Sequence, residues 1–534
     1  MKMTTVKEDA GEAKRRKLEA KLTGGSAPGA PLRHNQQQQQ QQQPKQKQKQ
    51  APQKASESDA ASGEDASGGE EARGPFVCDA NDVIAIRLVL TAGDMDTAEL
   101  FEPEFTHQIF RDDETIFGYR DLEVRVFLQA HLFKAFVEVS YTEKVASVLN
   151  PADDVVAMLK KQLGDDVFTD RAAFLAALQA DAAAPIPAGG GEVVAEWDSS
   201  SGGPSARGEA PGGAGTADVE VEAGTVAAGA AAGAEDGCKD TVRVFRLSDA
   251  EVWKWHARFE PLTLFYIDGA SALDSEDERW LLFAVIRTHA VTGAWRLLSF
   301  ATVYEFFVYP ASTRGRLSQI VVLPPFQRRG LGGRILEAVR AHAVARQFHD
   351  ITVEDPTPQL QRLRDAGDVR ALAGRPGVMA AVQRCAVAAS RLTGGDDAGA
   401  SKAALDLPAA VAEEARAQLC ICKPQMRRCW EALLYLMAKK AKAPDDSPAA
   451  AAFSELIIRR LTVLHCSDAR RDAGSKRVYP TESGFVMMRG RGTGGQATEV
   501  EEDSEDKADP AEVLADYFHD AMSNLAWLAT AVKI

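Results

Sequence analysis

Apolar and polar residues alternate along two stretches near the N-terminal end of the chain, which is the pattern of strands with one buried face. The apolar positions of the first stretch are Val83, Ile84, Ile86, Leu88 and Leu90. Those of the second are Leu122, Val124, Val126 and Leu128, followed by Phe136, Val137 and Val139. Residues 155–182 have helical spacing instead. The pattern predicts a small β-rich, mostly antiparallel domain over residues 76–183.

The central part of the chain changes repeatedly between strand and helix patterns. The predicted elements are a strand from Thr241, a helical segment within 249–269, a hairpin over 280–309 with its turn at Thr292-Gly293, a strand over 317–323, a helix over about 331–346 and a strand over 351–353. Pro324-Pro325 ends the fourth of these, because proline cannot donate to a ladder. We therefore predict an α/β domain over residues 239–368.

The C-terminal part has mainly helical patterns, interrupted at Gly395, at Pro444 and at an acidic, glycine-rich segment near 489–510. It predicts a small helical domain over residues 369–534. Two further segments have no apolar periodicity: 1–75, which contains an unbroken glutamine tract from Gln36 to Gln43, and the Gly/Ala-rich stretch 184–238. Such compositions cannot bury a core, so we expect both to be disordered.

Charge and composition narrow the class of partner. The chain carries 62 Lys and Arg against 77 Asp and Glu, a net charge of −15, which favours a cationic partner over direct nucleic-acid binding. No apolar run approaches the roughly 18 residues of a membrane span, and no secretory signal follows the first methionine. Seven irregularly spaced cysteines predict neither a disulfide framework nor a zinc site, so we expect a reducing compartment and no metal. Whether the KRRK run at 14–17 directs nuclear import stays open.

The segment from Leu317 to Arg334, LSQIVVLPPFQRRGLGGR, carries the most specific chemistry. A buried strand leads through a glycine-rich turn into a helix, whose first backbone N–H groups have no partner within the helix. Such a helix start binds anions. The segment lacks both the GxxxxGK[ST] and the GxGxxG patterns, but it matches Q/R-x-x-G-x-G/A, the pyrophosphate loop of acetyl-CoA-dependent N-acetyltransferases. Taken alone, the pattern also suits an ordinary glycine-rich turn.

Two carboxylates, Glu354 and Asp355, stand at the end of the following predicted strand. A lysine amine, with a pKa of about 10.4, must lose a proton before it can attack a thioester, so a carboxylate beside the reacting carbon has a role as general base. A turn with solvated charges would explain the same residues.

Five pieces of sequence resemble the catalytic subunits of the type B histone acetyltransferases, members of the GNAT acetyltransferases. They are FEPEFTHQIFRDDETIFGYRDL (101–122), LTLFYIDGASALDSEDERW (262–280), TVYEFFVYP (302–310), RLSQIVVLPPFQRRGLGGRILEAV (316–339) and DITVEDP (350–356). Together they cover the core from about 76 to 368. The resemblance implies a GNAT α/β fold and acetyl transfer from acetyl-CoA to lysines of newly made histone H4, by direct attack in a ternary complex.

Site residues follow from the same resemblance. Glu354 matches the general base, with Asp355 beside it, and Asp268 stands where the family has a longer glutamate. The positions that match acetyl-CoA contacts are Ile320, Val321, Val322, Gln327, Arg328, Arg329, Gly330, Leu331, Gly332, Gly333 and Thr357. Those that match histone contacts are Asp112, Asp113, Glu114, Trp280, Tyr304, Glu305 and Phe306.

The resemblance further implies a nuclear and cytoplasmic protein, and a WD-repeat histone chaperone as a partner. The sequence does not decide whether that chaperone binds. Two alternatives stay open: an acetyltransferase for polyamines or other small amines, which would also use an acidic groove, and a histone-binding chaperone without catalysis. The scattered histidines His107, His256 and His289 form no ligand set, and we expect them to be structural.

Overall fold

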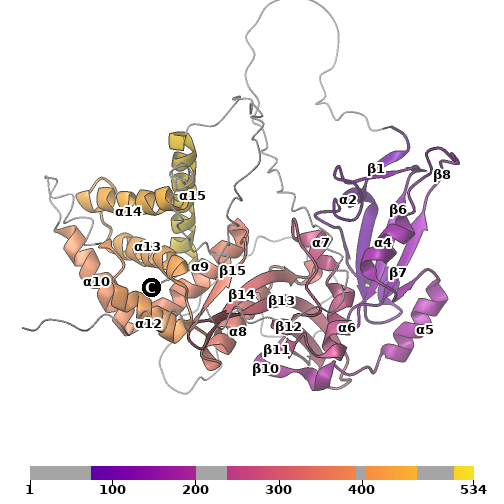
Figure 1. Ribbon diagram of the computed structural model, residues 1–534, viewed down its shortest axis with the longest axis horizontal. Coiled ribbons are helices and arrows are strands. Elements are labelled where there is room, and N and C mark those ends of the chain that lie inside the picture. Colours follow the sequence, from indigo (N-terminus) through magenta and orange to yellow (C-terminus); the bar gives the residue numbers. More distant parts are fainter. Residues whose placement is uncertain (1–73, 200–236, 392–404, 466–509, 534) are drawn as a thin grey trace, which may run out of the picture. The chain divides into compact units, whose positions relative to one another are not determined.

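The computed structural model describes residues 74–199, 237–391, 405–465 and 510–533 (Figure 1). The described residues all lie within one unit of the chain, Ala66–Ile534. The glutamine-rich segment therefore lies outside the described residues. None of the helices in the four described ranges is long and apolar enough to cross a membrane.

A five-stranded sheet forms the N-terminal domain, in the order β3-β2-β6-β7-β9. Its strands are β2 Ile84–Val89, β3 Leu100–Phe101, β6 Glu123–Gln129, β7 Ala135–Ser140 and β9 Val167–Phe168. Two short ladders join β1 (Val77–Asp79) to β4 (Thr115–Phe117) and β5 (Tyr119–Arg120) to β8 (Glu143–Lys144). The helices of this part are α2 Ala80–Val83, α3 Asp94–Thr97, α4 Val155–Leu163 and α5 Arg171–Asp181. Four of the six strand pairings of this domain are antiparallel, so the prediction of a mostly antiparallel domain is confirmed, but β2 pairs parallel with β6 and β7 pairs parallel with β9. Alternation shows which face of a strand is buried, but not the direction of its neighbour.

A six-stranded sheet forms the central domain, in the order β10-β11-β12-β13-β14-β15 (Figure 1). Its strands are β10 Glu192–Asp198, β11 Cys238–Arg246, β12 Trp280–His289, β13 Trp295–Val308, β14 Ser312–Val322 and β15 Asp350–Val353. Neighbouring strands pair antiparallel from β10 to β14, and β14 pairs parallel with β15. The predicted hairpin over 280–309 is confirmed as β12 and β13, and the predicted helix over 331–346 as α8 (Leu331–Ala345).

The edge strand β10 corrects the prediction of a disordered insertion over 184–238. Residues 184–199 are described, and within them Glu192–Asp198 pairs antiparallel with β11. Trp197 also packs under the guanidinium of Arg334, 4.2 Å from its ring centroid. The heptapeptide EVVAEWD is too short to give a recognisable strand pattern within a Gly/Ala-rich stretch. Its strand conformation depends on pairing with β11 rather than on its own sequence pattern. Residues 200–236 lie outside the described residues.

Helices cover the two faces of the central sheet. The Gln319 side chain of β14 donates to the carbonyl of Ser271, just after α7 (Leu262–Tyr266), at 3.0 Å. A β-carbon at Gly332, on α8, would lie 3.9 Å from the Val322 side chain. Because residues an odd number apart in a strand point to opposite faces, α7 and α8 cover opposite faces. On the α7 side, α6 (Ala250–Phe259) joins the sheet to the N-terminal domain, since the Trp255 indole donates to the His131 carbonyl at 2.8 Å.

The C-terminal region is helical, as predicted, and has its own hydrophobic core. Its helices are α9 Pro358–Ala373, α10 Pro376–Ser390, α12 Ala409–Leu419, α13 Lys423–Lys440, α14 Pro448–His465 and α15 Pro510–Ala531. The predicted domain boundary after residue 368 falls inside α9, whose Val369 and Leu372 belong to the C-terminal core. The acidic segment near 489–510 lies outside the described residues, except for Pro510.

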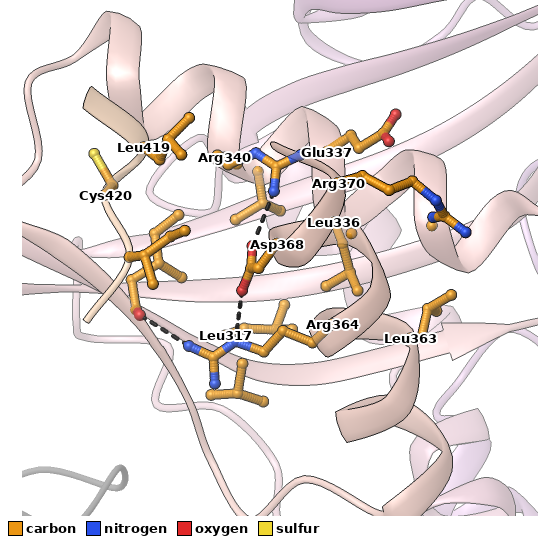
Figure 2. A pocket seen from close by; sticks show the side chains of 16 residues that line it. Leu317, Leu336, Glu337, Arg340, Leu363, Arg364, Asp368, Arg370, Leu419 and Cys420 are labelled. Atoms are coloured by element: carbon orange, nitrogen blue, oxygen red, sulfur yellow. Dashed lines mark hydrogen bonds and ion pairs between the residues drawn. The ribbon is translucent and has the colours of Figure 1, made fainter. Parts of the chain in front are cut away.

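Charged residues connect α9 to the helices and strand around it. A cavity of about 70 Å³ lies between α8, α9, β15 and residues 419–421. Figure 2 shows the chain of polar contacts that crosses it. Asp368 accepts from Arg340 of α8 at 2.9 Å, and Arg364 donates to the carbonyl of Ile351 in β15 at 3.2 Å. The backbone N–H of Ile351 in turn donates to the Cys420 carbonyl at 2.7 Å. The C-terminal region is therefore bonded directly to the strand that precedes Glu354.

His256 of α6 predicts a specific dependence of stability on pH. The imidazole is fully buried against Phe259 and Phe300, and neither of its nitrogens has a hydrogen-bond partner among the described residues. Burial lowers the pKa of His256 to about 3, whereas the unfolded chain has the ordinary value of about 6.5. The unfolded state therefore binds the proton first, and stability falls as the pH drops from 6.5 toward 3.

We expect the parent protein to lose about 2 kcal/mol more than the variant His256→Leu between pH 7 and pH 5. Urea unfolding of both proteins at the two pH values measures this difference, and the comparison cancels the contributions of the other titrating groups. Equal losses in the parent and the variant would contradict it.

Candidate active site

An opening between β14 and β15 lies at the centre of the candidate site. Parallel pairing joins Arg314–Leu317 to Asp350–Val353, and the N–H of Glu354 still donates to the Leu317 carbonyl at 2.9 Å. Beyond this point β14 continues to Val322, whereas the chain after Glu354 turns away into α9. The last residues of β14 thus have an open edge on the β15 side.

The ladder decides which backbone groups face this opening. The N–H of Leu323 donates to the Leu298 carbonyl of β13, so Leu323 bonds toward β13. Successive residues alternate in direction along an antiparallel ladder, and counting back places Val321 toward β13 and Ile320 and Val322 toward the opening. Of the three predicted coenzyme contacts in this strand, Ile320 and Val322 present their backbone groups to the opening and Val321 does not.

The glycine loop connects the open strand edge to α8. After the short helix η2 (Pro324–Phe326), Arg328 and Gly330 both have positive φ, at 61° and 77°, and Gly330 is the N-cap of α8. No side chain caps this helix start, so the amides of its first turn face outward for an anion. The Gln327 amide donates to the Val322 carbonyl at 3.1 Å, which connects the loop to the open edge. Thr357 caps α9 by accepting from Leu360 N–H at 3.3 Å.

Glu354 lies at the mouth of the opening. Its side chain is 39% exposed, and Ser318 Oγ donates to its Oε2 at 2.5 Å. The guanidinium of Arg316 lies 3.8 Å from its Oε1. A positive charge and a hydroxyl donor thus hold a half-buried carboxylate in place, and this carboxylate still reaches solvent.

The other two predicted catalytic carboxylates, those of Asp355 and Asp268, lie in more exposed positions than that of Glu354. Asp355 is exposed and has a positive φ of 32° at the turn into α9. Asp268 is 74% exposed, and its carboxylate lies 3.5 Å from His107 Nε2. The other ring nitrogen of His107 lies 3.5 Å from Glu114, so this histidine stands between a predicted catalytic and a predicted substrate residue. Both carboxylates are more solvated than Glu354.

An aromatic row lies beside the opening, on the same face of the sheet as Arg316. The rings of Trp280 and Tyr304 are 4.8 Å apart, and those of Tyr304 and Phe306 are 4.4 Å apart. Arg316 stacks over Phe306 at 4.4 Å. Three of the predicted substrate residues therefore form one continuous surface that leads toward Glu354.

Tyr304, the middle residue of this row, keeps its phenolic proton. Burial, together with the hydrogen bond that its hydroxyl donates to Asp277 at 2.7 Å, raises the pKa of Tyr304 to about 12. The hydrogen bonds from Arg279 hold the pKa of Asp277 well below its ordinary value, so Asp277 accepts that bond as a carboxylate. Tyr304 is neutral at physiological pH and does not act as a base there.

The side chain of Glu305 points to the face of the sheet opposite the aromatic row. Adjacent residues of a strand point to opposite sides, and Glu305 accepts from Arg246 at 3.0 Å with a side chain 17% exposed. The sequence grouped Tyr304, Glu305 and Phe306 as one contact surface. The structure brings the two aromatic side chains to it and turns the carboxylate away.

The three residues of the predicted acidic cluster 112–114 also differ in their exposure and contacts. Asp112 and Asp113 are exposed, whereas Glu114 accepts from Thr106 N–H and the Asn81 amide, both at 2.9 Å. Burial alone would raise the pKa of Glu114, but these hydrogen bonds and those of His107 lower it below its ordinary value. Glu114 therefore orders its own loop and is not available to a ligand in the way its two neighbours are.

Sequence reasoning missed Ser318, Arg316 and Asp277. Ser318 lies within the predicted strand over 317–323, Arg316 lies just before it, and Asp277 lies in the acidic run 274–278, DSEDE. Their contacts are made with residues that are distant in sequence, or they depend on the register in which the strands pair. Among the described residues no group of three or more His, Cys, Asp or Glu gathers where a metal ion could bind.

Comparison with known proteins identifies the two folded parts around this site. Residues 76–268 match the family described as histone acetyl transferase HAT1 N-terminus, and residues 246–363 match the acetyltransferase (GNAT) family. A histone acetyltransferase type B catalytic subunit from Cryptococcus neoformans is 27% identical over 310 residues, which covers 56% of this chain and 71% of that protein. The rat protein of the same name is 30% identical over 308 residues, covering 54% and 63%.

The chain is similar to the type B histone acetyltransferase catalytic subunits in both of these parts. It is an acetyltransferase, and the predicted GNAT α/β fold with a helical C-terminal region is confirmed. Among solved structures, an aminoglycoside acetyltransferase from a soil metagenomic sample is 16% identical, covering 22% of this chain and 78% of that one with a TM-score of 0.18.

Acetyl-CoA is the acetyl donor of GNAT acetyltransferases, and the site of this chain has the groups that the coenzyme requires. The uncapped start of α8 offers backbone donors for a pyrophosphate, and the strand edge at Ile320 and Val322 offers partners for an amide-bearing arm. Gly332 lets the chain approach closely at the first helical turn. The residues therefore fit the donor.

Proposed function

We propose that this protein transfers acetyl groups from acetyl-CoA to lysine side chains in the N-terminal tail of histone H4. The observation that carries the proposal is the position of Glu354. Its half-exposed carboxylate lies at the mouth of the β14–β15 opening and next to the aromatic row of Trp280, Tyr304 and Phe306. Such a surface suits the aliphatic stem and cationic head of a lysine.

In this proposal each group of the chain has a separate task. The first turn of α8 binds the pyrophosphate, and the backbone groups of Ile320 and Val322 align the pantetheine arm. When bound, acetyl-CoA supplies the thioester carbonyl that the amine attacks. Glu354 accepts the amine's proton, which makes lysine nucleophilic near neutral pH. Backbone N–H groups of the open strand edge donate to the oxyanion that develops, and its collapse breaks the C–S bond, so that coenzyme A leaves as a thiolate and the lysine keeps the acetyl group.

A basic tail also suits the charge of this protein. The net charge of −15 attracts a polycation, and Asp112 and Asp113 expose two carboxylates. We propose a nuclear role with a cytoplasmic share, and a WD-repeat histone chaperone as the partner that delivers the histone.

The direct test compares acceptors. The purified protein and acetyl-CoA are incubated with an H4 tail peptide, an H3 tail peptide or spermidine, and acetylated positions are read by mass spectrometry. We expect kcat/KM to be highest for the H4 tail. Higher kcat/KM for spermidine would favour a small-amine acetyltransferase. Histone binding without acetyl transfer to any acceptor would favour a chaperone.

Gly332→Val is expected to weaken acetyl-CoA binding at least tenfold, about 1.4 kcal/mol, because a branched side chain enters the path of the pyrophosphate. The β-carbon would also lie 2.9 Å from Leu363 Cδ2. The double variant Gly332→Val/Leu363→Ala therefore serves as the control, since it removes that contact. Calorimetric titration should show weakened binding in both variants. Recovery of full affinity in the double variant would mean that strain, not the coenzyme path, caused the loss.

Asp112→Asn/Asp113→Asn is expected to raise KM for the H4 tail peptide a few-fold at low salt, with little change at high salt. Glu114 stays intact because it orders the loop. The matched control removes two exposed charges elsewhere, by Glu99→Gln/Asp446→Asn. KM should respond to the first pair and not to the control pair. The same KM shift in both variants would indicate a general effect of net charge.

A further inference from the structure

Ser318 is an extra residue in β14. In the ladder between β13 and β14, Thr302 is opposite Gln319 and Val303 is opposite Leu317, so Ser318 has no opposite partner. This is a β-bulge, a feature that bends a strand and re-aims a side chain. The pairing of β14 with β15 ends at the residue before it. The bulge therefore lies where the coenzyme opening begins.

The re-aimed side chain reaches the candidate base. Ser318 Oγ donates to Glu354 Oε2 at 2.5 Å. The other carboxylate oxygen, Oε1, faces Arg316 at 3.8 Å, and Arg316 is itself held by its stack on Phe306. The two oxygens of Glu354 thus have different neighbours, one a hydroxyl donor and one a guanidinium.

We propose that Ser318 is a positioning residue for the acetyl transfer, acting through Glu354. A half-exposed glutamate samples several rotamers, and a hydrogen bond to one carboxylate oxygen selects the rotamer that faces the opening. The bulge fixes the hydroxyl on the strand itself, so the orientation of the base is set by the backbone that also lines the coenzyme site. This inference rests on the proposed role of Glu354 as general base.

The role predicts a loss in turnover rather than in binding. Ser318→Ala should lower kcat by about tenfold, the order expected for one charge-assisted hydrogen bond. KM for the H4 tail peptide and affinity for acetyl-CoA should change less than about twofold, because the hydroxyl touches the base. Ser318→Thr keeps the hydroxyl and should restore most of kcat. A merely structural role for Ser318 would not separate kcat from KM in this way.

A double-variant comparison decides the mechanism. In the Glu354→Gln background, Ser318→Ala should have little further effect on kcat, because the group that it positions has lost its function. An equal tenfold loss in both backgrounds would overturn the positioning role, and so would unchanged kcat in Ser318→Ala. If the parent transfers no acetyl group, or if Glu354→Gln keeps full activity, the proposed function or the base assignment fails instead. The two kinds of failure are therefore distinguishable.

Discussion

Glu354→Gln is expected to lower kcat roughly 10²- to 10⁴-fold, the usual contribution of a general base. The amide keeps the size of the side chain but cannot accept the proton of the lysine ammonium. Steady-state rates with saturating acetyl-CoA and H4 tail peptide measure the loss, and circular dichroism confirms the fold. A variant that keeps more than about a third of parental kcat, with chemistry shown to be rate-limiting, would contradict the assignment.

Asp355→Asn and Asp268→Asn are the matched controls, because each removes one carboxylate near the site. Asp355 is exposed, and Asp268 is 74% exposed on a different element. We expect each of these changes to cost less than Glu354→Gln. If Asp268→Asn proves the more damaging change, the base is Asp268, and Glu354 has an orienting role.

The dependence of rate on pH gives an independent signature. In Glu354→Gln, the residual kcat/KM should continue to rise with pH toward the ordinary lysine pKa of about 10.4, because water and hydroxide must then remove the proton. The parent should reach its plateau earlier. Parallel profiles in the two proteins would show that Glu354 does not take part in proton transfer.

Asp365→Ala is expected to lower the free energy of unfolding by about 3–5 kcal/mol, because it leaves one half-buried cationic donor and amide donors without their buried acceptor. Asp365 of α9 is 3% exposed and accepts from Arg428 at 2.7 Å. Gln425 and Asn524 also donate to it, both at 3.0 Å. Burial alone would raise the pKa of Asp365, but Arg428 and the hydrogen bonds hold it below its ordinary value. The carboxylate thus joins α9 to α13 and α15.

Urea unfolding of the parent and the variant measures this loss. The control Asp446→Ala removes an exposed aspartate of the same helical region and should stay within about 0.5 kcal/mol of the parent. A loss below about 1 kcal/mol for Asp365→Ala would mean that water replaces the carboxylate and that the network contributes little.

Local chemistry explains what the sequence predicted well. The strand, glycine loop and helix from Leu317 onward depend on residues that are neighbours in the chain, and the structure has the same three elements. Proline at 324 and 325 and glycine at 330 determine where each begins and ends. The same holds for Glu354, whose place after a short strand follows from the local pattern.

Features that depend on distant partners were not predictable in this way. The bulge at Ser318 exists because β13 pairs with β14 in a shifted register. The side chain of Glu114 points inward because the Asn81 amide and the Thr106 N–H donate hydrogen bonds to it. The opposite directions of Tyr304 and Glu305, by contrast, follow from strand alternation alone. That part of the site could have been corrected from the sequence.

The bond between Ile351 and Cys420 bears on the order in which the protein forms during synthesis. The strand that precedes the proposed base has an open edge until a segment about 70 residues further along the chain reaches it. At roughly 5–20 residues per second, the ribosome needs about 4–14 s to supply that segment. A nascent chain would expose an unpaired strand edge during this interval, and such edges recruit other chains. Truncated forms that end before residue 420 should therefore aggregate, even though every proposed catalytic residue is present in them.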